Sequence, residues 1–230
     1  MISPGAGATA GFLAVVGWVC IGVVWAAWHS GGARWAVRAA VGLGLVLVLA
    51  VSAGLAEAGV VRRLAESRAI LLFLWTWLGV AVGVAFSRVG SRVVGAVPVA
   101  ALVGFQAFRL PLELVLHRFY DEGAIPVQMT YSGANFDIVT GVLAVVCGLL
   151  VWRGVAVRMV VWVFNCVGLG LLGTVVRIAV LSAPTPLRVY MNDPPVQLIF
   201  HAPYTWILSV CVAGALLGHL LVFRWLWRGR

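Results

Sequence analysis

Four polar side chains, which include a guanidinium, a carboxylate and an imidazole, fall on one face of the fourth long apolar stretch. They are Gln106, Arg109, Glu113 and His117, at steps of three, four and four residues. At about 100° per residue, these side chains occupy one helical stripe roughly 80° wide. Ionisable groups inside a membrane span are costly, and they usually face the interior of a helix bundle or a water-filled cavity. The spacing therefore predicts a polar site inside the bundle, although no motif identifies a reaction.

This stripe is compatible with several kinds of chemistry. Arg109 could hold a small anionic ligand, whereas Glu113 or His117 could act as the acid or base of an intramembrane enzyme. A metal ion could be shared by His117, His201 and a carboxylate. Two histidine pairs near opposite membrane faces would suit a two-haem protein: His117 with His201, and His29 with His219. The alternative without a ligand is that the polar side chains only link the helices.

Further polar residues are predicted at the same end of the bundle. Asn135 is placed to cap the fifth helix, and Asp137 lies in its first turn, where the helix dipole favours a carboxylate. Arg177 lies near the outer end of the sixth stretch, and His201 lies in the last outer loop. We therefore predict one ligand site in the outer half of the bundle, formed by Gln106, Arg109, Glu113, His117, Asn135, Asp137, Arg177 and His201.

Arg109 requires a counter-charge, because a buried guanidinium is costly when it is unpaired. It precedes Glu113 by four residues, which is the less favourable order for an ion pair within one helix. The sequence therefore favours a partner on another helix, with Asp137 and Glu57 as candidates besides Glu113. Pro111 removes one backbone hydrogen bond and predicts a kink beside the arginine.

Composition places these residues in a membrane protein. Hydrophobic residues make up 63% of the 230 residues and charged residues only 10%, with a mean hydropathy of +1.08. A bilayer crossing needs about 20 apolar residues. We predict an all-α, polytopic seven-transmembrane-helix bundle that forms a single domain over residues 1–230, and we expect the lipid bilayer as its partner. The predicted spans are Ala8–Trp28, Val37–Ala56, Ala69–Ser87, Val93–Phe119, Phe136–Trp152, Met159–Leu181 and Tyr204–Phe223.

The distribution of arginine predicts the orientation of the bundle. With the N-terminus outside and the C-terminus inside, nine arginines lie on the cytoplasmic side and five on the outer side, as the positive-inside rule requires. The nine are Arg34, Arg38, Arg88, Arg92, Arg153, Arg158, Arg224, Arg228 and Arg230. The net charge of +9 is then a feature of topology. We expect a multi-pass protein of the inner (plasma) membrane and no nucleic-acid partner.

Two absences from the sequence exclude whole classes of protein. The chain has no lysine, so it cannot form a Schiff base with retinal or pyridoxal phosphate. Its four cysteines, Cys20, Cys147, Cys166 and Cys211, are isolated within the apolar stretches and show no spacing typical of zinc or iron–sulfur sites. No cofactor follows from the sequence.

Three segments carry a resemblance to known sequences. The pattern R-x-P-x-E at 109–113, Q-M-T at 128–130 and N-F-D-I-x-T-G at 135–141 resembles a group of uncharacterised bacterial multi-pass membrane proteins. The resemblance extends from Phe105 onward, whereas the first three predicted helices carry no recognisable signature. It implies a membrane fold and no activity.

Three functional classes remain open. The first is a receptor- or transporter-like protein that binds a small polar or anionic ligand in the outer cavity. The second is a structural subunit of a larger membrane complex, which would have membrane-protein partners. The third is an intramembrane enzyme, or a haem- or metal-binding redox protein, that uses Glu113 and His117.

Overall fold

The structure is a computed structural model that describes residues 3–30 and 35–228, so Arg34 and Arg230 lie outside the described residues. The described part contains helices and no β-strand. Its helices are α1 (Ala6–His29), α2 (Trp35–Glu57), α3 (Val60–Ala65), α4 (Ile70–Phe86), α5 (Arg88–Ala96), α6 (Val99–Phe105), η1 (Gln106–Phe108), α7 (Arg109–Asp121), η2 (Val127–Met129), α8 (Ile138–Trp152), α9 (Val157–Ser182), η3 (Leu198–Phe200), η4 (Ile207–Val212) and α10 (Ala213–Arg228). The all-α class predicted from the sequence is confirmed.

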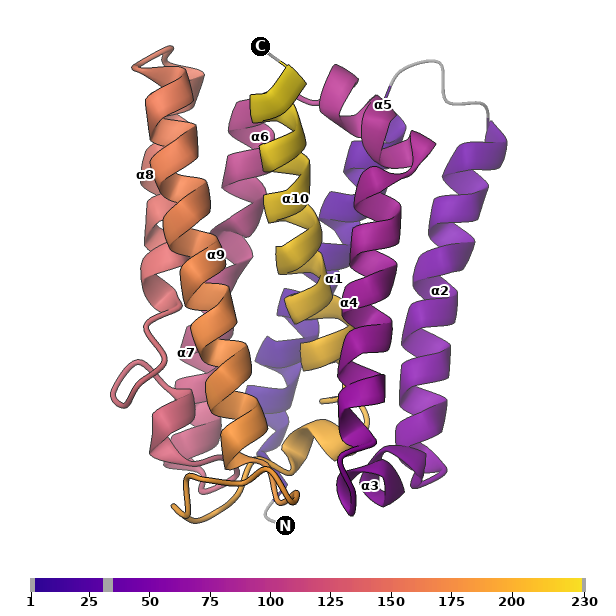
Figure 1. The fold of residues 1–230 in the computed structure, drawn as a ribbon, viewed down its shortest axis with the longest axis vertical. Helices are drawn as coiled ribbons and strands as arrows, with labels where there is room; N and C mark the ends of the chain where they lie inside the picture. The colour runs from indigo at the N-terminus through magenta and orange to yellow at the C-terminus, as the bar shows by residue number, and fades with distance from the viewer. Residues whose placement is uncertain (1–2, 31–34, 229–230) are drawn as a thin grey trace.

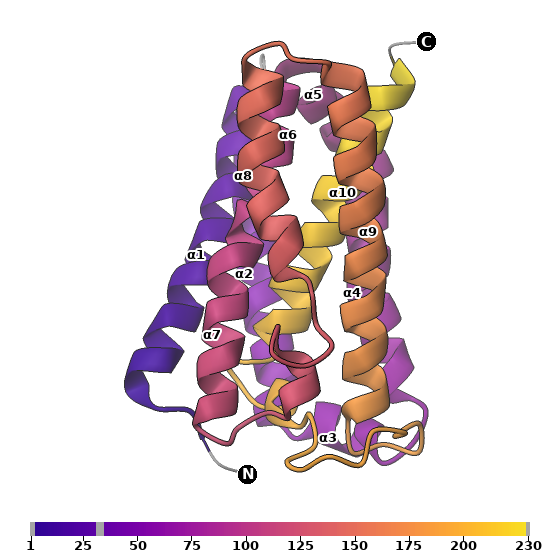
Figure 2. The ribbon, with the colours of Figure 1, turned by 90° about the vertical axis from the view of Figure 1, so that its left-hand side faces the viewer.

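The long helices lie side by side along one axis (Figures 1 and 2). α10 occupies a central position and packs against α4, α6 and α9. The short helix α3 lies at the end of the bundle where the chain begins, and α5 lies at the opposite end with the C-terminus (Figure 1).

Five segments within the described residues are long and apolar enough to cross a membrane. They are Ala6–His29, Trp35–Glu57, Val99–Asp121, Val157–Ser182 and Ile207–Arg228. α4 and α5 would together form a sixth, although they are bent by 60° relative to each other. α8 has only 15 residues, fewer than the roughly 20 that span a hydrocarbon core. Seven spans therefore stay a prediction, and the structure supports a multi-pass protein with five or six.

α8 is short because the segment before it is not α-helical, although much of it is buried. The segment runs from Glu122 to Asp137 beside α7 and α9 (Figure 2), and it buries Gln128, Thr130 and Asn135. Irregular backbone at membrane depth is tolerated only where protein covers it or where it lines a cavity. This segment therefore replaces the first turns of a full-length helix.

The predicted span Val93–Phe119 was wrong at its start. Val93 belongs to α5, and the backbone is extended at Val97 before Pro98, which precedes the first residue of α6. Proline disfavours helical geometry in the residue before it, so the two helices are separated at this point. The span itself begins at Val99 and continues through η1 into α7.

Aromatic and aliphatic packing joins α1 to the site-bearing helices. Phe12 of α1 is fully buried, and its ring lies 6.2 Å from that of Phe119 in α7 and 5.7 Å from that of Tyr204. α2 differs, because Ser52 and Ala56 are its only buried residues among those described. Its remaining apolar surface is the kind that a bilayer or another protein covers.

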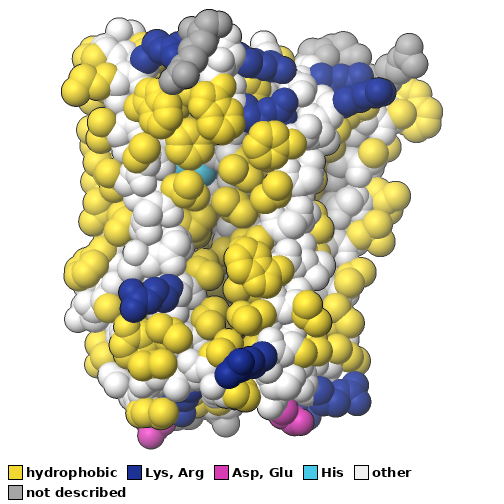
Figure 3. Space-filling model, viewed as in Figure 1, with side chains coloured by type: hydrophobic (Ala, Val, Ile, Leu, Met, Phe, Trp, Pro, Cys, Tyr) yellow, Lys and Arg dark blue, Asp and Glu magenta, His cyan; other side chains and the backbone are white. Residues whose placement is uncertain are grey.

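Acidic side chains are confined to one end of the bundle on the face shown in Figure 3. They appear only at the end where the chain begins, whereas arginine side chains appear in both halves of this face and gather at the opposite end. At that end, Arg224 of α10 donates hydrogen bonds to the Ala85 carbonyl and to Ser91 Oγ. The first bond satisfies a carbonyl group at the C-terminus of α4, and the second holds α5 against α10.

Candidate functional site

A short 3₁₀ segment places Arg109 in the bundle interior. η1 joins α6 to α7 immediately before Arg109, and Pro111 follows two residues later without an N–H group for the helical ladder. The tighter 3₁₀ turn changes the rotation of the chain between the two α-helical halves of this span. Gln106, Arg109 and Glu113 are all at most 1% exposed. The structure thus has the 3₁₀ segment η1 shortly before Pro111, and the predicted kink at the proline itself stays a prediction.

Arg109 is held by partners from three other elements. Its Nε donates to Oδ2 of Asp137 at 2.7 Å, and both side chains are buried. Its Nη1 lies 3.3 Å from the Gly168 carbonyl oxygen of α9 and 3.1 Å from Nε2 of His219 in α10. The ion pair joins α7 to the start of α8, so the expectation of an interhelical partner is confirmed. Glu57, another candidate partner, is exposed at the end of α2.

The contacts of His219 define its tautomer. A guanidinium has only donor hydrogens, so Nε2 of His219 must accept the hydrogen bond from Arg109. The proton of the neutral ring then lies on Nδ1, which is 2.7 Å from Oδ1 of Asn165. The Nδ2 group of Asn165 donates to the His219 carbonyl oxygen at 3.2 Å. α9 and α10 therefore exchange two hydrogen bonds behind Arg109.

Asn135 joins the second carboxylate to the same cluster. Its Nδ2 group lies 2.9 and 2.8 Å from the two carboxylate oxygens of Glu113 and 3.0 Å from the Met129 carbonyl oxygen. Its Oδ1 accepts the backbone N–H of Asp137. Asp137 occupies the N-cap position of α8, but its carboxylate accepts from Arg109 and Thr140 instead of from the helix backbone. The predicted capping role of Asn135 is therefore replaced by a role inside the cluster.

Close helix approach at Gly168 permits these contacts. A Cβ atom at Gly168 would lie 2.5 Å from Cε1 of His219 and 2.9 Å from Cγ2 of Thr140, closer than real side chains pack. Only glycine leaves room for α9 to bring its carbonyl group to Arg109 while the imidazole lies against it.

A cavity of about 110 Å³ adjoins the charged cluster. Arg109, Glu113 and Asp137 contribute to one wall, and apolar side chains of α4, α7, α9 and η4 form most of the others. The loop after α9 closes the cavity at the end of the bundle where the chain begins. Its residues Val196, Leu198 and Phe200 line the cavity there and are buried. This loop, residues 183–206, therefore covers the site at that end and is called the covering loop.

One donor of Arg109 has no partner. Nη2 is buried and makes no hydrogen bond with any residue that the structure describes, although Nε and Nη1 are both engaged. Oε1 of Gln106 is likewise unpartnered, while its Nε2 donates to the Ala215 carbonyl oxygen at 2.9 Å. A buried donor without an acceptor costs about 1–3 kcal/mol, so a ligand acceptor or a water molecule at Nη2 would stabilise the site.

Three predicted site residues lie apart from the cluster. The side chain of His117 is 25% exposed and stacks on Tyr131 at 4.4 Å, with Asp121 3.8 Å away. Arg177 is exposed on α9, because its position on the helix turns it away from α8 and α10. His201 is half-buried in the covering loop and forms no side-chain hydrogen bond within the described residues. The structure thus brings together Arg109, Glu113, Asn135 and Asp137, and it places Gln106 nearby on η1.

The sequence-based site omitted His219 and Asn165. Both are polar residues in the middle of apolar stretches. A polar side chain is costly inside a membrane span, so these two positions were the signal by which the sequence could have indicated them. His219 is fully buried against Arg109, whereas His29 is exposed at the end of α1, so the two do not form a pair. Within residues 3–30 and 35–228, no group of three or more His, Cys, Asp or Glu side chains is placed to hold a metal ion.

Fold and site together define an all-helical protein with several membrane-spanning helices and a buried arginine–carboxylate cluster. The chain belongs to the family described as a domain of unknown function (DUF8737), which matches residues 67–227. The match begins before the third predicted span and so extends further than the resemblance from Phe105 onward. No curated protein and no solved structure matches the chain.

Proposed function

We propose that this protein binds a small ligand with strong hydrogen-bond acceptors in the cavity beside Arg109, as a receptor or transporter does. The observation that carries the proposal is the unpartnered Nη2 of Arg109, a side chain that is 1% exposed and lines the cavity. A role confined to joining helices needs no free donor and no adjoining space. Retaining a buried charge for stability alone is also unfavourable compared with apolar packing.

The remainder of the cluster suits a binding role because it fixes the guanidinium. Asp137, Gly168 and His219 hold Nε and Nη1 from three directions. A donor held in place loses little conformational freedom when a ligand binds, which favours affinity. Glu113 is fixed by Asn135 on the same wall and would distinguish ligands by charge.

A panel of acceptor-bearing compounds, both neutral and anionic, tests this proposal by thermal unfolding in detergent. At least one compound should raise the midpoint of the wild type and of Arg177→Met, which alters an exposed arginine of α9. The same compound should leave the midpoint of the double variant Arg109→Met/Asp137→Asn unchanged, because that variant removes the donor while keeping the site neutral. Equal stabilisation of all three proteins would reject Arg109 as the binding group.

A subunit of a larger membrane complex is the second candidate, and α2 favours it. Leu43, Val46 and Leu47 are each more than half exposed along this helix, which packs less than its neighbours. A partner helix would cover this surface. Cross-linking from cysteines introduced on α2 in native membranes would capture such a partner, and lipid-only contacts would leave the protein uncross-linked.

We also propose that the arginine-rich end is cytoplasmic and that the membrane is the plasma membrane. Arg88, Arg92, Arg153 and Arg158 flank helix ends there, while the acidic residues lie in the other half. Cytoplasmic loops carry an excess of arginine and lysine, so the charge asymmetry supports an outer position for the cavity.

A further inference from the structure

The charges around the cavity restrict what the free donor can bind. Asp137 neutralises Arg109 at 2.7 Å, and Glu113 is a second carboxyl group on the same wall. With Glu113 protonated the wall is neutral, and with Glu113 ionised it carries one negative charge. In neither state is the wall net positive. An anionic head would therefore enter an enclosed site without a free counter-charge, and burying a charge without a counter-charge is costly.

The other walls exclude a purely hydrophilic ligand. Besides the charged side chains, the lining is almost entirely aliphatic and aromatic, with Phe73, Leu116 and Val175 as examples. A small polar molecule would lose its hydration and gain hydrogen bonds on only one side. A ligand satisfies both surfaces when it places an uncharged polar head next to Arg109 and a hydrocarbon portion against the remaining walls.

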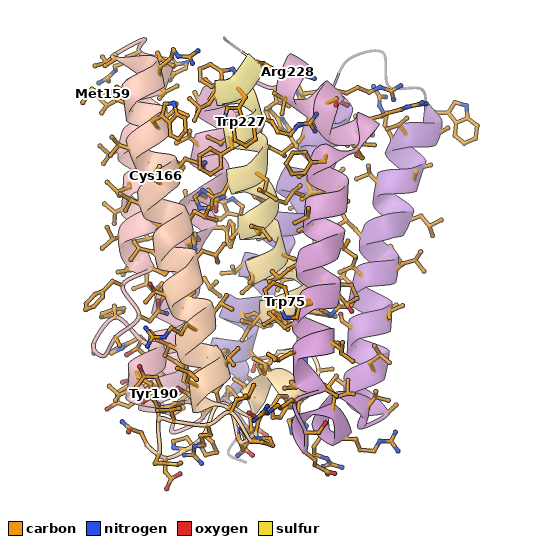
Figure 4. All side chains as sticks on the ribbon, in the orientation of Figure 1. Trp75, Met159, Cys166, Tyr190, Trp227 and Arg228 are labelled. Carbon is orange, nitrogen blue, oxygen red and sulfur yellow. The ribbon has the colours of Figure 1, made fainter. Side chains whose placement is uncertain are left out.

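The cavity reaches the surface on the side of the bundle that would face lipid. Most of its partly exposed lining residues belong to α4, α9 and η4, and they include Leu71, Val176 and Leu208. Thr185 and Ile199, which are also partly exposed, belong to the covering loop. α4 and α9 both pack against α10, and the face between them is mostly hydrophobic, with arginine side chains among the hydrophobic ones in its lower half (Figure 3). The exposed Trp75 extends from α4 over this region (Figure 4). The covering loop lies between the cavity and water at the end of the bundle where the chain begins.

The size of the cavity limits the ligand to one chain. Its volume of about 110 Å³ is somewhat smaller than the 150 Å³ engineered cavity that binds benzene. It can therefore take a head group and the first few carbon atoms, and the rest of a longer chain must continue between α4 and α9. η4 widens the backbone of this wall as a π-helix, a form that is frequent at functional sites.

We infer that the ligand is an uncharged, single-chain lipid with a carbonyl-type acceptor, which enters from the bilayer between α4 and α9 and accepts a hydrogen bond from Nη2 of Arg109. This inference rests on the proposed function, because it names the ligand of that same site. Glu113 then excludes the anionic counterpart, and the apolar walls exclude short polar compounds.

The test uses the full chain in nanodiscs and radiolabelled methyl palmitate, with empty nanodiscs as the background. We expect saturable binding at one site per chain. Unlabelled methyl palmitate should compete, whereas palmitate, methyl butyrate and hexadecane should compete at least tenfold more weakly. These three probes lack, in turn, the neutral head, the chain and the acceptor.

Two variants with matched controls locate the site. Ala179→Phe fills the cavity without touching a charge, and Thr174→Phe places the same ring on the exposed face of α9. Ala179→Phe and Arg109→Met/Asp137→Asn should each weaken binding at least tenfold. Thr174→Phe and Arg177→Met should leave it unchanged.

The outcomes separate the inference from the proposed function. If palmitate or methyl butyrate binds more tightly than methyl palmitate in an Arg109-dependent manner, the lipid inference is rejected and the proposed function stands. The lipid inference is also rejected if no probe binds more to the protein in nanodiscs than to empty nanodiscs. The same holds if binding is unchanged in both the Arg109 and the Ala179 variants. The proposed function is then decided separately by the thermal panel, where a lack of any Arg109-dependent stabilisation rejects it too.

Discussion

Nη1 of Arg109 lies 3.1 Å from Nε2 of His219, and this contact fixes the direction of every hydrogen bond behind the guanidinium. Because arginine only donates, the imidazole accepts at Nε2 and donates from Nδ1 to Asn165. The arginine is consequently supported by a neutral ring on one side and by Asp137 on the other.

The tautomer of His219 is open to direct measurement. We expect ¹⁵N NMR of histidine-labelled protein to show one ring with a protonated Nδ1 and an unprotonated Nε2, the less common tautomer of free histidine. Assignment comes from loss of this signal in His219→Gln, with His29→Gln as the control at an exposed position. A protonated Nε2 on His219 would mean that the ring does not accept from Arg109.

Substitution of Arg109 alone should destabilise the protein far more than substitution of both Arg109 and Asp137. Arg109→Met alone leaves a buried carboxylate without its counter-charge, and we expect a loss of about 3–5 kcal/mol in the free energy of unfolding. Adding Asp137→Asn should restore most of this loss, because the carboxylate that had lost its counter-charge is then replaced by a neutral amide. Unfolding in denaturing detergent, monitored by circular dichroism, measures the free energy of unfolding of the single and the double variant. Additive losses in the double variant would show that the two side chains do not interact.

Close approach of α9 should make Gly168 sensitive to a single methyl group. Gly168→Ala places Cβ against the His219 ring and Thr140, so we expect a loss of about 1–3 kcal/mol from overpacking. Gly170→Ala lies on the same helix with no neighbouring atom within 4 Å, and it should be neutral or slightly stabilising. Thermal unfolding of the two variants side by side provides the comparison. Equal midpoints would show that α9 does not approach α10 this closely.

The orientation of the bundle can be checked with cysteines in intact cells. After the four native cysteines are replaced, Ser132→Cys should react with a membrane-impermeant thiol reagent, because Ser132 is exposed at the end of the bundle that we propose to be outside. Arg228→Cys, at the opposite end in Figure 4, should react only after the membrane is permeabilised. Labelling of position 228 from outside would reverse the proposed topology.

Features that depend on local sequence were predictable. The length and hydropathy of the first, second and sixth stretches indicated helices close to α1, α2 and α9, because bilayer thickness sets the length of an apolar run. The period of the α-helix likewise placed Gln106, Arg109 and Glu113 on one face, and all three are buried. The order of Arg109 and Glu113 also indicated an interhelical partner, which is Asp137.

Features that depend on how elements meet were not predictable. The sequence could not show that the segment before α8 is irregular and buried, whereas Pro98 was a local signal for the break between α5 and α6. His117 continues the polar stripe, yet it lies beyond the buried part of α7, and Arg177 is turned away by the rotation of α9. His219 joins the site because Gly168 allows α9 close to α10. Helical period fixes which side chains share a face, but only the packing of helices against one another decides what that face meets.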